Sequence, residues 1–140
     1  MVDKVMIDTN LLVYLYAKNP PSKYLKVKEI ISDNFELLIV STQILGELYN
    51  VLTKKNLTTK EEAKQIIGEI ATNFLVVEID ILKVLAALDI NSGYGYSYWD
   101  SLVISTALLC NCSILYSEDM QHNQLIENKT RIVNSFAEIK

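Results

Sequence analysis

The sequence is poor in the residues on which several classes of enzyme and metalloprotein depend. Its 140 residues include one histidine, His122, so a ribonuclease mechanism that uses paired histidines is excluded by count. The only cysteines, Cys110 and Cys112, have no second pair or histidine cluster with which to complete a zinc site. We expect both cysteines to be small buried thiols and His122 to be a solvated residue in a polar turn.

Long apolar runs and prolines are scarce as well. The longest apolar candidate, residues 74–90, is interrupted by charged residues, whereas a membrane span needs about 20 consecutive apolar residues. The N-terminus leads directly into a strand and has no small-residue cleavage site, so we expect no secretory signal and a cytoplasmic protein. The only prolines, Pro20 and Pro21, predict a break between two helices.

Half of the residues are apolar, which is enough for an ordinary core, and the length predicts a single domain over residues 1–140. The net charge of −4 argues against a protein that coats nucleic acid, because such proteins are usually basic. It does not argue against an enzyme that cuts nucleic acid, since acidic residues of a site add negative charge that bound cations offset. An acidic chain also suits a basic protein partner.

Short apolar runs alternate with segments of helical periodicity. This alternation predicts a parallel sheet of about four to five strands in a three-layer α/β/α fold. The expected strands are residues 4–8, 37–40, 75–79, 113–116 and 130–133. The expected helices are residues 11–17, 22–33, 41–52, 58–72, 80–91 and 101–110.

Four acidic residues stand at the ends of these elements or on the inner turn of a helix. Asp8 ends the first strand, and Asp119 follows the fourth. In open parallel sheets ligands bind beyond the carboxyl ends of the strands, so two carboxylates there point to one site. Glu47 lies one turn into the third helix and Asp100 opens the last one, so both can reach the same edge of the sheet.

Carboxylates in this arrangement predict a divalent cation. Mg²⁺ and Mn²⁺ are hard cations that take oxygen ligands. Two carboxylates 4 Å apart repel by about 4 kcal/mol at an effective dielectric constant near 20, and a bound cation relieves that repulsion. Taken singly, Asp100 and Asp119 could be helix caps and Glu47 an exposed helix acid. Their joint occurrence favours the metal site, without deciding between one ion and two.

The sequence around each acid resembles the PIN-domain ribonucleases, and within that family the VapC-type toxins of toxin–antitoxin pairs, over residues 4–136. The motifs that carry the resemblance are Asp8-Thr9-Asn10, Leu45-Gly46-Glu47-Leu48, Tyr98-Trp99-Asp100 and Ser117-Glu118-Asp119. The resemblance implies a PIN-like fold with two sets of site residues: the metal-holding Asp8, Glu47, Asp100 and Asp119, and the hydrogen-bond partners that orient them, Thr9, Asn10 and Ser117.

The resemblance also implies an activity and partners. The activity is hydrolysis of RNA phosphodiester bonds by water that Mg²⁺ or Mn²⁺ activates. The partners are the RNA substrate, a separate antitoxin and a second copy of the chain. The aromatic turn 93–99 is expected to serve packing and subunit contact more than base stacking. VapC-type toxins commonly carry Gly where Asn123 stands, and Asn tolerates positive φ, so the turn should survive.

Other functions stay open on the sequence alone. A phosphatase of the haloacid dehalogenase type would need Asp at the position of Asn10, and a receiver domain would need an acceptor where Asp80 has a helix-cap pattern. A non-catalytic binding module with the same fold is a further alternative. Within the last motif, the strand-exit turn could aim either Glu118 or Asp119 inward, and only the family pattern favours Asp119.

Overall fold

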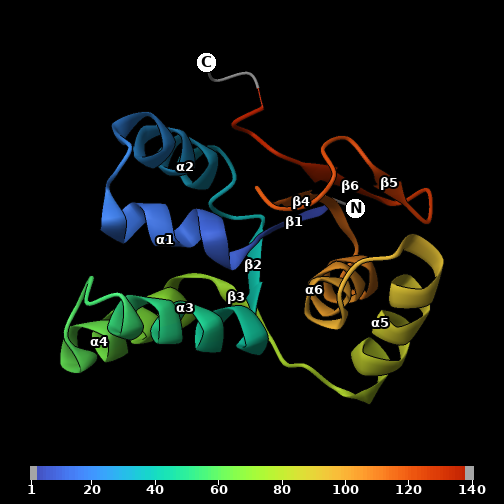
Figure 1. The fold of residues 1–140 in the computed structure, drawn as a ribbon, viewed down its shortest axis with the longest axis horizontal. Coiled ribbons are helices and arrows are strands. Elements are labelled where there is room, and N and C mark those ends of the chain that lie inside the picture. Colours follow the sequence, from blue (N-terminus) through green and yellow to red (C-terminus); the bar gives the residue numbers. More distant parts are fainter. Residues whose placement is uncertain (1–2, 138–140) are drawn as a thin grey trace.

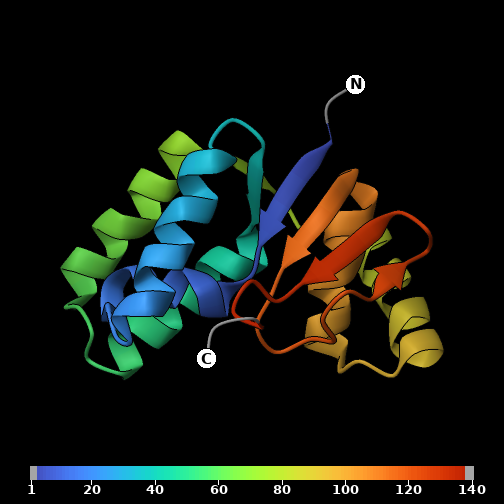
Figure 2. The same ribbon diagram turned by 90° about the horizontal axis from the view of Figure 1, so that it is seen from above.

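The computed structural model describes residues 3–137, and these form a single sheet with helices on both faces (Figures 1 and 2). The order of the strands is β3-β2-β1-β4-β6-β5, and all neighbours are parallel except β5 and β6. The strands are β1 (Lys4–Ile7), β2 (Leu38–Ser41), β3 (Leu75–Val77), β4 (Cys112–Tyr116), β5 (Leu125–Ile126) and β6 (Thr130–Val133).

Helices connect the first four strands, β1 to β4, and complete the three predicted layers. They are α1 (Thr9–Ala17), α2 (Pro21–Asp33), α3 (Thr42–Lys54), α4 (Lys60–Asn73), α5 (Ile81–Tyr94) and α6 (Tyr98–Leu109). The chain steps outward from β1 to β2 to β3 and then returns past β1 to β4. Because crossovers between parallel strands are right-handed, the return places α5 and α6 on the face opposite α1–α4 (Figure 2).

The central strands are buried on both faces, which is why they appear in the sequence as continuous apolar runs. Met6 in β1, Ile39 in β2 and Leu115 in β4 are each 0–1% exposed. Of the cysteines, Cys112 is buried as expected and Cys110 only in part. No helix within residues 3–137 has the length and apolar character needed to cross a membrane.

The sheet has six strands and not the four to five that we predicted. The additional strand, β5, has only two residues and pairs antiparallel with β6 across a tight turn. Glu127 and Asn128 in this turn both have positive φ, 51° and 54°. Two successive residues of this kind are typical of a type I′ hairpin turn, but Glu is an unusual choice there. The hairpin therefore lacks its usual sequence signal.

Helix ends also differ from the prediction. Helix α6 begins at Tyr98 with Ser97 as its N-cap, so Asp100 lies inside the first turn and does not open the helix. Helix α5 continues to Tyr94 and ends at Gly95, whose φ of 80° suits a residue without a β-carbon. The predicted turn at Asn123 has φ of 67°, as expected for Asn in place of Gly.

The strand order reverses between β1 and β4, and the candidate site lies at this point. The main-chain N–H of Asp8 donates to the carbonyl of Tyr116 at 2.9 Å, so Asp8 and the residue after β4, Ser117, leave the sheet side by side. A reversal of this kind opens a crevice because the connecting helices depart to opposite faces.

Candidate functional site

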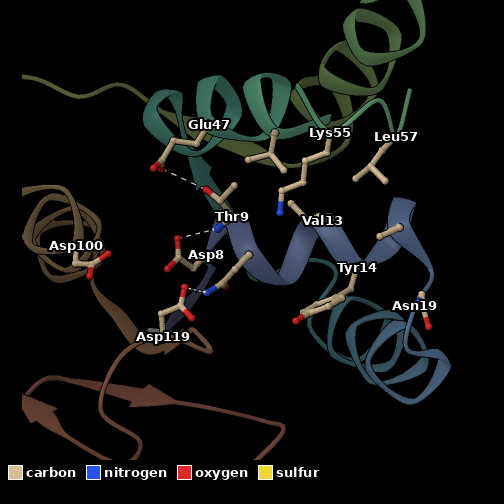
Figure 3. Close-up of a pocket in the computed structure, with 13 residues that line it drawn as sticks. Asp8, Thr9, Val13, Tyr14, Asn19, Glu47, Lys55, Leu57, Asp100 and Asp119 are labelled. Atoms are coloured by element: carbon tan, nitrogen blue, oxygen red, sulfur yellow. Dashed lines mark hydrogen bonds between the residues drawn. The ribbon is translucent and has the colours of Figure 1, made fainter. Parts of the chain in front are cut away.

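A cavity of about 480 Å³ lies at the reversal point, and all four predicted acids line it (Figure 3). Asp8 comes from the end of β1, Glu47 from α3, Asp100 from the first turn of α6, and Asp119 from the turn after β4. The structure thus brings together carboxylates from segments far apart in the sequence.

Asp8 is the innermost of the four, with 8% of its surface exposed. One carboxylate oxygen accepts from the N–H of Thr9 at 2.7 Å, and the other accepts from Oγ of Ser117 at 3.0 Å. Burial raises the pKa of Asp8 from 3.8 to about 6, against the lowering effect of these two hydrogen bonds. The negative charges of Glu47 and Asp100 raise the pKa further.

Glu47 and Asp100 are half-buried, and both contribute to a local excess of negative charge. Oγ1 of Thr9 donates to Oε1 of Glu47 at 3.3 Å. Burial, with a smaller contribution from the charge of Asp100, raises the pKa of Glu47. Burial also raises the pKa of Asp100, the charge of Asp119 adds to this, and a hydrogen bond with Ser97 opposes it. Both side chains are therefore harder to ionise in the folded protein than in water.

Asp119 is exposed and is held by Asn10, whose Nδ2 donates to Oδ2 of Asp119 at 2.8 Å. An ionised carboxylate only accepts, so this bond determines the orientation of the amide. The other end of the amide, Oδ1 of Asn10, is buried at the cavity and has no hydrogen-bond partner in the structure. A buried carbonyl oxygen without a donor is a place for a water molecule or a ligand hydroxyl.

Glu118 points away from the cavity, which resolves the choice between the two neighbouring acids. It accepts from the hydroxyl of Tyr14 at 2.7 Å and forms an ion pair with Lys23. The ammonium of Lys23 also lies over the rings of Tyr14 and Phe136, at 5.1 and 5.0 Å from their centroids. This cluster occupies Glu118 and leaves Asp119 facing the cavity.

A family model for the PIN domain matches residues 5–127. The chain belongs to the PIN domain family. No curated protein shows a significant match to the sequence. The resemblance drawn from the four acidic motifs is therefore confirmed at the level of the family.

Several solved structures with a similar fold come from toxin–antitoxin systems. The DNA-bound VapBC of Salmonella typhimurium has a TM-score of 0.71 at 16% identity, covering 94% of this chain and 97% of that one. VapBC2 of Rickettsia felis, bound to a promoter DNA fragment, has a TM-score of 0.65 at 20% identity, covering 91% of this chain and 97% of that one. Mycobacterium tuberculosis VapC20, a Sarcin-Ricin loop cleaving toxin, has a TM-score of 0.67 at 14% identity, covering 80% of this chain and 87% of that one. At such identities the likeness is one of fold.

The donor chemistry of the PIN domain cavity fits a hard divalent cation, but the four carboxylates do not form a closed cage. Within residues 3–137 no three His, Cys, Asp or Glu side chains lie close enough together to hold an ion as they stand. Carboxylates can bind a cation through bridging water molecules as well as directly. Mg²⁺ also keeps several of its waters and needs few direct protein ligands.

The residues predicted to orient the acids all contact them: Thr9 contacts Asp8 and Glu47, Ser117 contacts Asp8, and Asn10 contacts Asp119. His122 is exposed and lies outside this cavity, with Nδ1 accepting from the N–H of Asn134 at 2.9 Å.

The outer part of the PIN domain cavity was not predicted from the sequence as part of the site. It is lined by Val13, Tyr14, Ala17, Asn19, Val51, Lys55 and Leu57. Helical spacing could have revealed part of it, because Val51 follows Glu47 one turn along α3 and Lys55, the C-cap residue of that helix, follows four residues later.

Proposed function

We propose that this PIN domain is a metal-dependent endoribonuclease and the toxin of a toxin–antitoxin pair. The observation that carries the proposal is the shared cavity of Asp8, Glu47, Asp100 and Asp119 at the reversal of the strand order. Relatives in fold support the choice of RNA, since one of them is named as a toxin that cleaves the Sarcin-Ricin loop. The PIN-domain match favours this reaction over the phosphatase and receiver alternatives.

In this mechanism Asp8, Glu47, Asp100 and Asp119 would hold Mg²⁺ or Mn²⁺, directly or through water. The ion would supply an activated water and offset charge on the attacking and leaving oxygens. Ser117 and the N–H of Thr9 keep both oxygens of Asp8 in one orientation and favour its ionised form.

Asn10 has a different part in the mechanism. Its Nδ2 holds Asp119, while the unpartnered Oδ1 is available to accept a hydrogen bond from a water molecule or a ribose hydroxyl. Thr9 connects α1 to Glu47 through its hydroxyl. The role of the protein is thus to hold carboxylates in place and to present one acceptor to the substrate.

Cleavage of labelled single-stranded RNA by the purified protein tests the proposal. We expect activity with Mg²⁺ or Mn²⁺, loss with EDTA, and no cleavage by Asp8→Asn, which removes a charge that the cation needs. Asp89→Asn is a matched control, because Asp89 is an exposed acid on α5 and does not line the cavity. Undiminished cleavage by Asp8→Asn would rule out Asp8 as a ligand, and equal cleavage of DNA would remove the preference for RNA.

An antitoxin is part of the same proposal. The fold relatives from Salmonella typhimurium and Rickettsia felis were solved as VapBC. In this chain an arginine of a basic partner segment could occupy the place of the cation by pairing with Asp8 or Asp100. Replacing the arginines of the antitoxin should then relieve inhibition, and unchanged inhibition would argue against such a plug.

A homodimer completes the proposal, and α5 offers the better surface for it. The aromatic turn is partly used inside the chain, because the Tyr96 hydroxyl accepts from the N–H of Gln121 at 3.1 Å and that of Tyr94 accepts from Glu127 N–H at 3.1 Å. Trp99 of this turn is 63% exposed, but α5 presents four apolar side chains that are 50–65% exposed: Ile81, Leu82, Leu85 and Leu88. Light scattering at tens of micromolar should detect a dimer that Leu85→Lys dissociates, and a wild-type monomer would count against it.

A further inference from the structure

The cavity continues beyond the acids as a trough between α1 and α3. Both helices start at the carboxyl ends of neighbouring parallel strands, and they pack against each other. Glu47, Val51 and Lys55 follow at successive turns along one side, and Val13 lies on the facing side (Figure 3). Lys55 is eight residues beyond Glu47, or about 12 Å along the helix axis at 1.5 Å per residue.

The two ends of this trough have opposite charge. Among the described side chains that line it, Lys55 is the one cation, and its nitrogen points from α3 towards α1 (Figure 3). Within the part of the chain that the structure covers, no carboxylate oxygen lies within 4.0 Å of its Nζ. The acids and Lys55 thus line different parts of one trough, at backbone positions about 12 Å apart.

The walls between the two ends suit a nucleotide better than a free ion. Val13, Val51 and the 36%-exposed Leu57 give an apolar surface beside Lys55. Stacked single strands carry one phosphate for about every 3.4 Å, so 12 Å covers roughly three to four nucleotides, and fewer in an extended strand. A strand with its scissile phosphate at the acids therefore brings another phosphate to Lys55.

We propose that Lys55 and the adjoining Leu57 form a subsite for a second phosphate of the RNA strand, within about four nucleotides of the bond that is cut. The inference rests on the proposed ribonuclease function and adds the path of the substrate. It assigns Lys55 a binding role, because phosphate contacts position a strand and do not read its bases. The acids repel the RNA backbone, and Lys55 supplies attraction at the far end of the same trough.

Steady-state cleavage of single-stranded RNA with Mg²⁺ tests the subsite. We expect Lys55→Gln to raise KM roughly fivefold with kcat unchanged, to a similar degree on different sequences. The slope of log(kcat/KM) against log[salt] should become less steep by about 0.7, the value for one phosphate of a single strand. Lys55→Arg should restore KM. Lys54→Gln is the matched control, since Lys54 is an exposed neighbour that does not line the trough, and it should behave as wild type.

Substrates with one uncharged methylphosphonate linkage locate the contact. At one position within about four nucleotides of the cut, the neutral linkage should weaken substrate binding by the wild type. It should not weaken binding by Lys55→Gln, because that variant has already lost the contact between Lys55 and the phosphate. A role of Lys55 in stability alone would not produce this pattern. Equal kinetics of Lys55→Gln and Lys54→Gln would overturn the subsite while leaving the ribonuclease function intact. Weaker antitoxin binding with unchanged RNA kinetics would assign the trough to a protein partner, and absence of cleavage by the wild type would overturn both proposals.

Discussion

The two ends of the cavity differ in how their side chains are held. At the inner end, Asp8 is 8% exposed and both of its oxygens accept hydrogen bonds. At the outer end, Lys55 and Leu57 are exposed, and the Lys55 ammonium has no carboxylate within ion-pair distance among residues 3–137. A metal ion needs ligands in a defined geometry. A flexible RNA strand is better bound by an ammonium group on a flexible side chain. The proposed function therefore has the chemistry at the inner end and substrate capture at the outer end.

The largest effect should come from Asp8→Asn at the inner end. We expect cleavage to fall by at least about 100-fold, because the change removes a charge that the cation needs. Loss of a metal ligand should have a larger effect than loss of a hydrogen-bond partner that only orients a ligand. Mn²⁺ titration by calorimetry should show weakened binding in parallel. Retained metal affinity with lost cleavage would mean that Asp8 acts without binding the ion.

The burial of Asp8 also predicts how stability depends on pH in the absence of metal. Because its pKa is about 6 in the folded state and 3.8 unfolded, the unfolded chain loses this proton first as pH rises. The free energy of unfolding should therefore fall between pH 4 and 6, by up to about 3 kcal/mol at 1.36 kcal/mol per pKa unit, and stay low above that window. Urea denaturation in EDTA at a series of pH values measures this free energy of unfolding.

Asp8→Asn serves as the control for this pH dependence, since its side chain does not titrate in that range. Its free energy of unfolding should change less between pH 4 and 6 than that of the wild type. Saturating Mg²⁺ should stabilise the wild type at pH 7, because the ion binds the ionised acids of the folded state only. Parallel curves for the two proteins in EDTA would show that Asp8 has an ordinary pKa.

A smaller effect is expected from Ser117→Ala, which removes the donor to one oxygen of Asp8. Partners that orient metal ligands typically contribute 10- to 100-fold to metal affinity, so Mn²⁺ binding should weaken to that degree. Ser105→Ala is the control, because Ser105 is also fully buried but donates to the carbonyl of Lys83, outside the cavity. Equal Mn²⁺ affinity of the two variants would contradict a specific role for Ser117.

The smallest effect should come from Glu118→Gln, beside Asp119 but directed away from the cavity. Gln can still accept from the Tyr14 hydroxyl and loses only the partly exposed ion pair with Lys23, worth about 1 kcal/mol or less. We expect less than a threefold change in kcat/KM, against at least tenfold for Asp119→Asn. Similar losses in both variants would place Glu118 among the groups that act on the substrate.

Much of the fold could be predicted because its signals are local. Buried central strands appear as apolar runs, and α4 begins with a capping box of Thr59 and Glu62, which is a local sequence signal for a helix start. The strand β5 escaped prediction because two residues are too few for a pattern and Glu127 conceals the turn. The start of α6 was misplaced by three residues, since Ser97 and Asp100 are both good caps and only the hydrogen bond to Ser97 decides between them.

By itself the sequence determined the order of the longer strands and of the helices and placed each acid close to an element end, because both follow from local residue patterns. The direction of neighbouring side chains in a turn was decided only in the tertiary structure. Glu118 turns outward because Tyr14 and Lys23, which lie 104 and 95 residues away in the chain, hold it there. Tertiary packing also placed Lys55 in the same trough as Glu47 and raised the pKa of Asp8, since burial and facing helices are properties of the assembled chain.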